Sequence, residues 1–507
     1  MLTKLIAFLF AMAVIAIPFD AIPGVKAFGE LAHESSFYLF AIAIGLYNLK
    51  VAGAILAGDF DAQVGGRFIW LTGTAIVVVI AISAIWNAID ISTATFHNRD
   101  GFPKLINSAT VIVYGLTLAL LTRAIVPGRW YTCLALPICV SASLCVGFGI
   151  LEAFDRAGVS LPLYHALNSM LHAGSDLAVQ SWDGSTNLKL IEVWDKRLRT
   201  VSFEPPAFGN FSGLAWPWLL AAIFMTKGVR RAVHICLLIA FTVLIVAAQA
   251  RTGWLLLATD IAVFGLARFV FLPPHGRVRR SAALIINSGV VFASIALVIV
   301  YVARFDEIVR STVSGSSVSD ISRLAYQVTA GRMFAMNPIS GAGLGQFAFK
   351  ASSYMPEWGY FSPEIKASLQ YPEAPWPNTY SLYARLAAEL GVVGLVGWIA
   401  IWVTLMVSVR RAGLVYSHLG RTVPEVAYPI IMNCAGVLVA AVTTDTFRTP
   451  MIWITLGVGA CLSARAQQLA GGLVQARPFS DPTVRDDRRY IIGVALAHRL
   501  RGAFWCG

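Results

Sequence analysis

Charged residues are scarce in this sequence. They occupy 13% of the 507 positions, whereas hydrophobic residues occupy 57%. A soluble domain averages about 25% charged residues. The few charges are too sparse to cover the surface of a water-soluble protein of this length, and the mean hydropathy of +0.70 agrees. The composition argues against a soluble enzyme and predicts that lipid surrounds much of the chain.

Features of disulfide, metal and nucleotide sites are also missing. The first six of the seven cysteines lie inside apolar runs, which argues against a disulfide framework or a cysteine metal site. A Gly-Lys-Ser phosphate loop, a fixed-period repeat and low-complexity tracts are absent. We therefore predict no metal and no cofactor. The net charge of +12 fits membrane topology better than nucleic-acid binding, because the basic residues gather at short turns.

Long apolar runs are abundant, and a membrane-spanning helix needs about 20 mainly apolar residues. The runs lie near 4–22, 35–57, 67–92, 104–125, 131–152, 211–226, 232–250, 253–272, 281–303, 381–408, 426–445 and 450–466. We predict an all-α polytopic membrane protein of about 12 transmembrane helices. Residues 1–466 are then one transmembrane domain, and 467–507 are a basic cytoplasmic tail. The first run also fits a signal peptide, but the even count and the charge pattern favour a retained span.

Short basic turns set the predicted orientation, because cytoplasmic loops are enriched in Lys and Arg. Three such turns contain Lys227, Arg230 and Arg231, then Arg277, Arg279 and Arg280, then Arg410 and Arg411. With these turns and both termini in the cytoplasm, two long loops, 153–210 and 305–378, face the opposite side. The second is the largest soluble piece of the chain, and its length suggests a function.

Arg251 interrupts apolar sequence that otherwise runs from Ala232 to Leu272. A run of this length must fold back once, and Arg251-Thr-Gly253 supplies the turn. The arginine is then expected at the outer membrane edge. One interpretation is an arginine that anchors lipid headgroups. The other is a fixed cation for a phosphate or pyrophosphate, whose oxygens guanidinium binds bidentately.

Loop 305–378 carries further candidates. Ser322-Arg323 opens an amphipathic stretch that also contains Arg332, and Gly341-Ala-Gly343 follows Asn337-Pro338. Glycines allow a tight turn in which the backbone approaches a ligand. Alone, however, this glycine run is a weak indication of a phosphate site.

Several other charged residues allow a functional or a structural interpretation. Glu204 precedes the sixth predicted span and is either a general base or a solvated loop carboxylate. Arg385 and Glu389 are four residues apart on one helix, so we expect an ion pair; a second is expected between Asp445 and Arg448. Asp260 and Lys50 are predicted intramembrane charges, which are often functional, but neither has an evident partner in the sequence.

Taken in order, these pieces are similar to those of a known family. Phe203-Glu204-Pro205, Gln249-Ala-Arg251-Thr-Gly253, Ser322-Arg323, Pro338-Ile-Ser-Gly341-Ala-Gly343-Leu-Gly345 and Asn378-Thr-Tyr380 stand in sequence between about 200 and 460. In this order the chain resembles the O-antigen ligase/polymerase superfamily.

The resemblance implies an integral-membrane glycosyltransferase with a GT-C-like fold in the bacterial inner membrane. Such enzymes take glycan from an undecaprenyl-pyrophosphate carrier at the periplasmic face, without metal or nucleotide sugar. Arginines hold the pyrophosphate leaving group, and by position this role falls on Arg251 and Arg323. Glu204 and Tyr380 are expected to position the acceptor hydroxyl. The expected substrate-binding residues are Arg332, Asn378, Gly341 and Gly343.

The resemblance leaves the acceptor open. Ligases have a histidine nine residues before a Gly-x-x-Gly pair, but here Tyr380-Ser381 or Pro377-Asn378 stands there, and His97, His165 and His172 are distant in sequence. We therefore favour a polymerase of O-antigen or exopolysaccharide repeat units. A ligase that transfers glycan to lipid A-core and a twelve-span transporter or flippase are the alternatives. The expected partners are the lipid-linked oligosaccharide, membrane lipid, and chain-length-regulator and flippase proteins.

Overall fold

The computed structural model describes most of the chain. The described residues are 1–22, 24–25, 28, 31–56, 67–172, 197–267, 318–372, 376–419 and 424–476. Three predicted features lie outside them: the span at 281–303, the basic turn at 277–280 and the tail from 477 onward.

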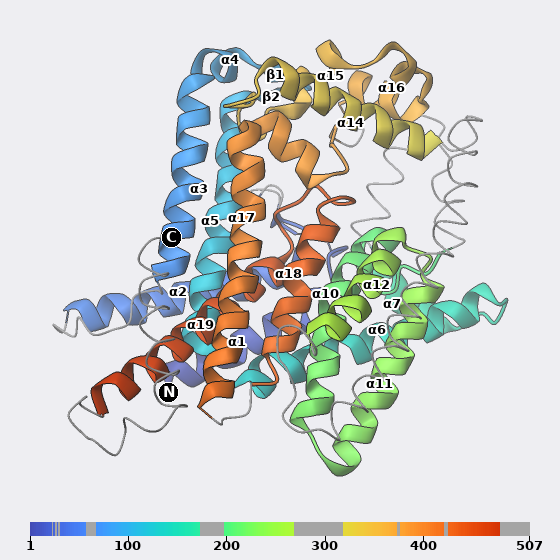
Figure 1. The fold of residues 1–507 in the computed structure, drawn as a ribbon. Helices are drawn as coiled ribbons and strands as arrows, with labels where there is room; N and C mark the ends of the chain where they lie inside the picture. Colours follow the sequence, from blue (N-terminus) through green and yellow to red (C-terminus); the bar gives the residue numbers. More distant parts are fainter. Residues whose placement is uncertain are drawn as a thin grey trace.

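The described chain is helical apart from one two-stranded hairpin, which confirms the predicted all-α class (Figure 1). Strands β1 (Thr95–Phe96) and β2 (Arg99–Asp100) pair antiparallel, with Thr95 opposite Asp100. The membrane-type helices are α1 (Leu2–Ile15), α2 (Ser35–Leu56), α3 (Arg67–Trp86), α5 (Gly101–Ile125), α6 (Leu136–Arg156, preceded by the π-helix η2, Tyr131–Ala135), α10 (Pro205–Met225), α11 (Gly228–Ala247), α12 (Arg251–Leu266), α17 (Leu382–His418), α18 (Ala427–Ala440) and α19 (Pro450–Ala476). The other helices are α4 (Ala88–Thr93), α7 (Pro162–Leu171), α14 (Val318–Met336), α15 (Phe347–Tyr354), η4 (Glu357–Phe361) and α16 (Pro363–Gln370).

Seven helices in the described ranges are long and apolar enough to cross a membrane: α2, α3, α5, η2–α6, α10, α11 and α17. Helices α1 and α18 are apolar but shorter. The chain is thus a polytopic membrane protein, while the count of twelve and the GT-C-like arrangement stay predictions. Some predicted ends are wrong. Helix α1 ends at Ile15 rather than near 22, and α19 continues to Ala476, past the predicted end at 466.

The helices divide into central and peripheral ones. In α10, 83% of the most apolar 18-residue window is buried, against 17% in α3. Two glycines explain the central place of α10. A Cβ on Gly209 would lie 2.8 Å from the Gly253 nitrogen, and one on Gly213 would lie 2.4 Å from Leu256 Cβ, so α12 approaches at backbone distance. On α3, exposed apolar side chains such as Ile82 and Ile85 suit contact with lipid instead.

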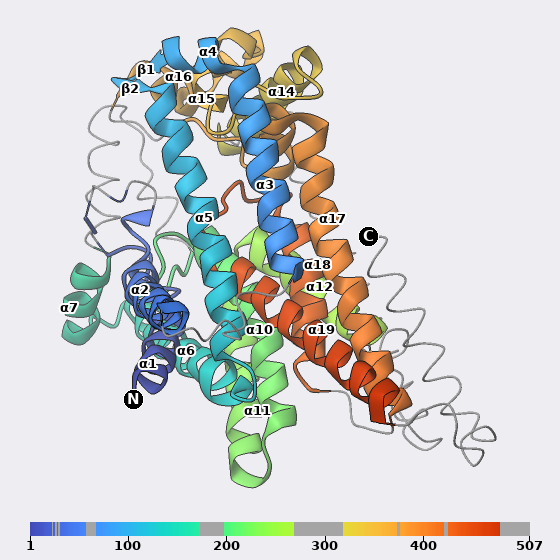
Figure 2. The same cartoon turned by 90° about the vertical axis from the view of Figure 1, so that its left-hand side faces the viewer.

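Residues 318–370 form a helical cap (α14, α15, η4 and α16) over one end of α17, α5 and α3 (Figures 1 and 2). Tyr326, Met333, Phe347 and Ile365 form its small apolar core. The part of the predicted loop 305–378 that the structure describes is therefore mostly folded. Its packing fixes the cap residues relative to the membrane helices.

The glycine run after α14 joins the cap to a break in α17. Gly391 has φ 68° and ψ −164°, which interrupts the helix. There the Gly343 nitrogen donates to the Glu389 carbonyl at 2.9 Å, and the Val392 nitrogen donates to the Pro338 carbonyl at 2.7 Å. A Cβ on Gly341 would lie 2.3 Å from the Glu389 carbonyl carbon. The glycines therefore let two backbone segments pair, and their predicted contact with substrate stays a prediction.

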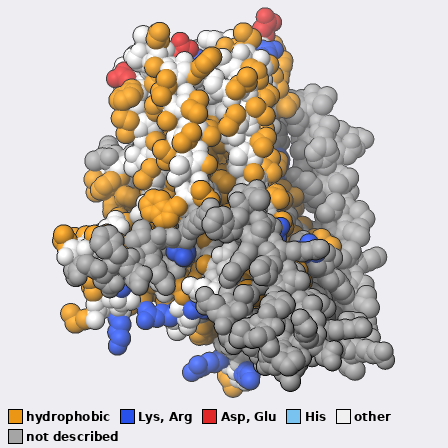
Figure 3. Space-filling view, turned by 60° about the vertical axis from the view of Figure 1, so that its left-hand side comes forward, with side chains coloured by type: hydrophobic (Ala, Val, Ile, Leu, Met, Phe, Trp, Pro, Cys, Tyr) orange, Lys and Arg blue, Asp and Glu red, His pale blue; other side chains and the backbone are white. Residues whose placement is uncertain are grey.

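Charge is distributed unevenly over the surface. On the face shown in Figure 3, Lys and Arg side chains gather over the lower part, whereas the Asp and Glu side chains in view lie at the upper rim. Apolar side chains cover the surface between them. A charge-poor apolar band with opposite charges at its two ends fits a protein that lies across a bilayer.

Candidate active site

A group of charged side chains gathers where the N-terminus of α10, the cap and the segment before α17 meet. We call Arg323, Glu204, Glu364, Tyr380 and Arg448 the charged cluster. Arg323, Arg448 and Glu364 all act electrostatically on Glu204. These residues come from four separate stretches of chain, so the fold alone brings them together.

Arg323 is the cation of the cluster contributed by the cap. Its guanidinium carbon lies 5.3 Å from the centroid of the Tyr380 ring, a cation–π contact. Its Nε is buried without a hydrogen-bond partner. Within the described residues it has no carboxylate within ion-pair distance. A buried guanidinium nitrogen without a hydrogen-bond partner costs free energy, so this group is suited to bind an anion.

Glu364 and Tyr380 are linked directly. The Tyr380 hydroxyl donates to Glu364 Oε1 at 2.6 Å. Burial raises the pKa of Glu364, while the hydrogen bonds from Tyr380 and Ser322 and the charge of Arg323 oppose the rise. Burial and the neighbouring Glu364 carboxylate hold the pKa of Tyr380 well above its ordinary value. Tyr380 therefore stays protonated and is a hydrogen-bond donor.

Asn378 shapes the turn that presents Tyr380. Tyr380 has a φ of 53°, which is unusual for a side-chain-bearing residue. The Asn378 side-chain oxygen accepts a hydrogen bond from the Tyr380 nitrogen at 3.2 Å, as in an Asx turn. The structure thus gives Asn378 a structural contact, and its predicted contact with substrate stays a prediction.

Glu204 is the N-cap residue of α10, and Pro205 directly after it begins the helix. Its side chain makes no capping hydrogen bond. Burial and the Glu364 carboxylate raise the pKa of Glu204, whereas Arg323 and Arg448 lower it. A half-buried carboxyl between two cations, with its oxygens uncommitted among the described residues, can accept a proton from a bound hydroxyl.

The connection between α1 and α2 also reaches this region, which the sequence analysis missed. Asp20 Oδ1 accepts a hydrogen bond from the Phe203 nitrogen at 2.6 Å, next to Glu204. Arg448 Nε lies 3.8 Å from Glu34 Oε1. Burial raises the pKa of both Asp20 and Glu34. The available signal was Asp20 itself, an acidic residue inside the apolar run predicted at 4–22.

His33 lies at the edge of the same region. Partial burial and the Arg448 cation lower the pKa of His33 from its ordinary value, so its imidazole is neutral at pH 7. A neutral imidazole is a competent proton acceptor. Sequence reasoning considered only His97, His165 and His172. It overlooked His33 because nothing in the local sequence links it to Arg448.

Arg251 is the first residue of α12, at the crossing of α10 and α12. The neighbouring Thr252 hydroxyl donates to Thr443 Oγ1 at 3.0 Å. The arginine charges that act on Glu204 are those of Arg323 and Arg448. Arg448 is therefore a cation near Glu204 that sequence reasoning did not expect there, and a direct role for Arg251 opposite Arg323 stays a prediction.

Arg332 lies away from the cluster. Its side chain is exposed on α14, and Nη1 donates to the Tyr354 carbonyl at 3.2 Å. This contact joins two helices of the cap. The predicted role of Arg332 in substrate binding also stays a prediction.

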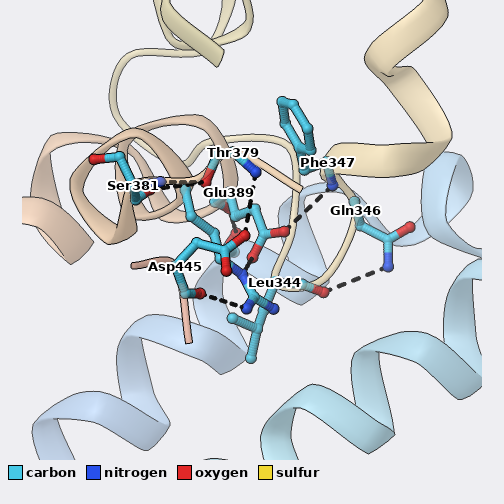
Figure 4. Close-up of polar contacts among 9 residues, drawn as sticks. Leu344, Gln346, Phe347, Thr379, Ser381, Glu389 and Asp445 are labelled. Atoms are coloured by element: carbon cyan, nitrogen blue, oxygen red, sulfur yellow. Dashed lines mark hydrogen bonds and ion pairs between the residues drawn. The ribbon is translucent and has the colours of Figure 1, made fainter. Parts of the chain in front are cut away.

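A second polar network braces the segment that carries Tyr380 (Figure 4). Arg385 Nε lies 3.1 Å from Glu389 Oε2, which confirms the expected ion pair. Arg385 Nη1 donates to the Asp445 carbonyl at 2.9 Å, and Asp445 Oδ2 accepts from the Thr379 nitrogen at 3.1 Å. Glu389 Oε1 also accepts from the Phe347 nitrogen at the start of α15. The network therefore fixes the cap, α17 and the 441–449 turn to one another.

Residues 235–399 match a family model described as O-antigen ligase. Over this segment, about a third of its length, the chain is similar to the O-antigen ligase/polymerase superfamily. No curated protein sequence matches the chain. The matched segment contains Arg251, Arg323, Glu364 and Tyr380, whereas Glu204 lies before it. Members of that family are glycan-transferring enzymes, and the similarity supports an enzymatic function for this protein.

Proposed function

We propose that the protein transfers glycan from an undecaprenyl-pyrophosphate carrier to an acceptor hydroxyl, with the charged cluster as its active site. The observation that carries the proposal is the arrangement of Arg323. Its guanidinium has a buried nitrogen without a partner and stands beside Glu204 and Tyr380. An anionic leaving group needs such a cation, and a hydroxyl nucleophile needs such a carboxylate.

In the proposed reaction three residues act on the reacting groups, and a pair of residues positions one of them. Glu204 takes the proton of the acceptor hydroxyl as the new oxygen–carbon bond forms at the anomeric carbon. The bond from that carbon to the phosphate oxygen breaks, and the pyrophosphate leaves with the electron pair. Arg323 and Arg448 stabilise the charge that develops on the pyrophosphate. The Glu364–Tyr380 pair holds the ring against Arg323 and so fixes the guanidinium.

An apolar groove supports delivery of the donor from the membrane. It is lined by side chains of α3, α5 and α17, among them Ile76, Leu390 and Trp398, and by Phe447. Phe447 directly precedes Arg448 of the charged cluster. A polyprenyl chain in this groove would place its pyrophosphate at the arginines, which is the arrangement that a lipid-linked donor requires.

The distribution of charge supports a periplasmic active face. The ends of α5 and α10 remote from the cap are followed by basic residues, among them Arg129, Lys227 and Arg230, all exposed. Basic residues favour the cytoplasmic side. The cap and the charged cluster then face the periplasm, where lipid-linked repeat units are joined. The membrane that has a cytoplasmic and a periplasmic face is the bacterial inner membrane.

Between acceptors, we favour a polymerase that extends lipid-linked repeat units of O-antigen or exopolysaccharide, because no histidine stands beside Tyr380 in the sequence. The second candidate is a ligase that uses lipid A-core as acceptor. The position of His33 near Arg448 favours it, since it supplies a neutral imidazole at the cluster. The family match is to glycan-transferring enzymes, which argues against a transporter.

Complementation of a deletion strain tests both levels of the proposal. Arg323→Ala should abolish long-chain glycan at unchanged protein level, whereas Lys366→Ala, which removes an exposed cation from the same cap, should restore normal chains. Normal chain lengths with Arg323→Ala would remove the charged cluster from the mechanism.

The glycan pattern of the deletion strain separates the acceptors. A polymerase defect leaves single repeat units on lipid A-core. A ligase defect leaves full-length polymer on the undecaprenyl carrier and bare lipid A-core.

A further inference from the structure

A second charged site lies at the other end of the molecule. A cavity of about 500 Å³ is lined by residues of α1, α2, α5 and α19, among them Thr3, Tyr47, Lys50, Arg123 and Arg465. Arg123 stands in the last turn of α5. The first residue of that helix, Gly101, accepts a hydrogen bond from Gln346 of the cap. Arg465 of the cavity lies 15 residues along α19 from Pro450, which follows Arg448 by two residues. About 22 Å of helix therefore separates the cavity from the charged cluster.

The described residues that line the cavity include three cations and no carboxylate. Arg123 Nε is buried without a hydrogen-bond partner. Among the described residues, Lys50 Nζ donates to the Thr3 hydroxyl at 3.2 Å, and the Arg465 guanidinium lies 5.8 Å from the Trp130 ring centroid. None of the three has an ion-pair partner in the part of the chain that the structure describes. Three mutually repelling cations around one space are stabilised when an anion enters it.

The size and the donors of the cavity fit a phosphate group. Its volume lies in the range of small-molecule sites, about 300–1,000 Å³. Two guanidinium groups bind phosphate oxygens bidentately, and an ammonium adds a point charge. Carboxylates, which would repel a phosphate, are missing from the lining.

The surroundings distinguish a lipid from a free ion. Lys50 is flanked along α2 by exposed apolar side chains: Leu49 is 69% exposed, and Leu56 is 88% exposed. In α2, only 11% of the most apolar window is buried. An amphiphile would therefore place its phosphate among the cations and its acyl chains along α2. A soluble phosphate would leave this apolar surface uncovered.

We infer that this cavity binds the phosphate of an anionic membrane lipid, such as phosphatidylglycerol, and so joins α1 and α2 to α5 and α19. Basic pockets between membrane helices are suited to such headgroups. Helices α1 and α2 are connected by the segment that carries Asp20 and Glu34. The lipid is thus a structural ligand. By holding α1 and α2 against α5 and α19, it also fixes the position of the segment that connects them.

The experiment measures thermal unfolding of the full-length protein in a zwitterionic detergent. Phosphatidylglycerol, phosphatidylcholine, inorganic phosphate and pyrophosphate are titrated separately. We expect phosphatidylglycerol to raise the Tm of the wild type and phosphatidylcholine to leave it unchanged. In an Arg123→Gln/Arg465→Gln variant, half-maximal stabilisation should need at least about tenfold more phosphatidylglycerol, because each lost charged hydrogen bond is worth roughly one such factor.

Two variants keep the result interpretable. Arg129→Gln removes an exposed arginine outside the cavity and should keep the wild-type response. Arg123→Lys keeps the charge and should retain most of it, which separates loss of the anion site from misfolding. Equal stabilisation by phosphatidylcholine, or an unchanged response in the double variant, overturns the site. If inorganic phosphate or pyrophosphate raises the Tm at the same concentrations as phosphatidylglycerol, the ligand is a free anion and the assignment to lipid is overturned.

Discussion

The Tyr380 hydroxyl donates a 2.6 Å hydrogen bond to Glu364 Oε1, and this pair joins the segment before α17 to helix α16 of the cap. The ring of Tyr380 also lies 5.3 Å from the guanidinium of Arg323. The Tyr380 side chain therefore orients the Arg323 cation through the face of its ring and the Glu364 carboxylate through its hydroxyl. The pair explains how a cap of short helices can hold Arg323 at a fixed place above the membrane helices.

Tyr380→Phe separates these two contacts. The ring remains under Arg323, but the Glu364 carboxylate loses a hydrogen bond that lowers its pKa. The pKa of Glu364 should then rise further, and glycan transfer should fall by about tenfold, the effect of one charged hydrogen bond. Transfer measured in membranes against pH checks this, and the loss should be largest at low pH. Tyr371→Phe, which changes an exposed tyrosine of the same segment, should behave like the wild type. If the ratio of the variant's transfer rate to the wild-type rate did not change with pH, this would contradict the role of the hydrogen bond.

Glu204→Gln tests the proposed base. Burial raises the pKa of Glu204, so the carboxylate that accepts the proton forms at a higher pH than for an ordinary glutamate. Wild-type transfer should rise with pH through this pKa. The variant should lose about 10²–10⁴-fold in rate together with that dependence. Glu357→Gln, an exposed carboxylate on η4, is the matched control. If Glu204→Gln keeps the wild-type pH profile, another group, such as His33, is the base.

The sequence predicted the helical membrane fold because apolar runs of about 20 residues have few alternatives in a lipid environment. It failed at helix ends that tertiary contacts decide. The run near 4–22 is apolar almost throughout, yet α1 stops at Ile15. The following residues turn toward the start of α10, where Asp20 accepts the Phe203 nitrogen. A hydrogen bond across 183 residues leaves no trace in local composition.

The site was predictable only in part, for the same reason. Arg323, Glu204 and Tyr380 belong to short pieces that stand in a characteristic order, and the structure places them together. Arg448 and His33 carry no such local pattern. Sequence spacing suggested an Asp445–Arg448 ion pair, which stays a prediction, but it did not suggest that Arg448 lies 3.8 Å from Glu34. Only the packing of the α1–α2 connection against the 441–449 turn reveals that relation.

Asp20 gives the protein a predictable dependence of stability on pH. Burial and the Glu34 carboxylate raise the pKa of Asp20 from 3.8 to about 8. Between these two values the folded protein binds a proton that the unfolded chain does not. The free energy of unfolding should therefore fall as pH rises from about 4 to about 8. Asp20→Asn should remove this part of the slope and raise the Tm at pH 7, since the amide oxygen can still accept the Phe203 nitrogen. Thermal unfolding at several pH values measures it, with the exposed Asp100→Asn as control. Parallel slopes for wild type and Asp20→Asn would show that Asp20 is ionised in the folded protein.

Gly391→Ala tests whether the break in α17 is needed to seat the cap. The φ of Gly391 is 68°, and an added Cβ would lie 2.2 Å from the Ile339 carbonyl oxygen, so both the backbone and the neighbouring segment would have to shift. A loss of about 1–3 kcal/mol is expected from the backbone conformation alone. Gly397→Ala is the matched control: it lies on the same helix, an added Cβ meets nothing within 4 Å, and alanine favours a helix by up to about 1 kcal/mol. Differential scanning fluorimetry should therefore give a lower Tm for Gly391→Ala and an equal or higher one for Gly397→Ala. Limited proteolysis should cut the cap faster in the first variant only, because the pairing of Gly343 with Glu389 depends on the same break. Equal Tm values and equal cleavage rates for the two variants would mean that the cap is held by its side-chain contacts, chiefly the Glu389 and Arg385 network, and not by the backbone pairing.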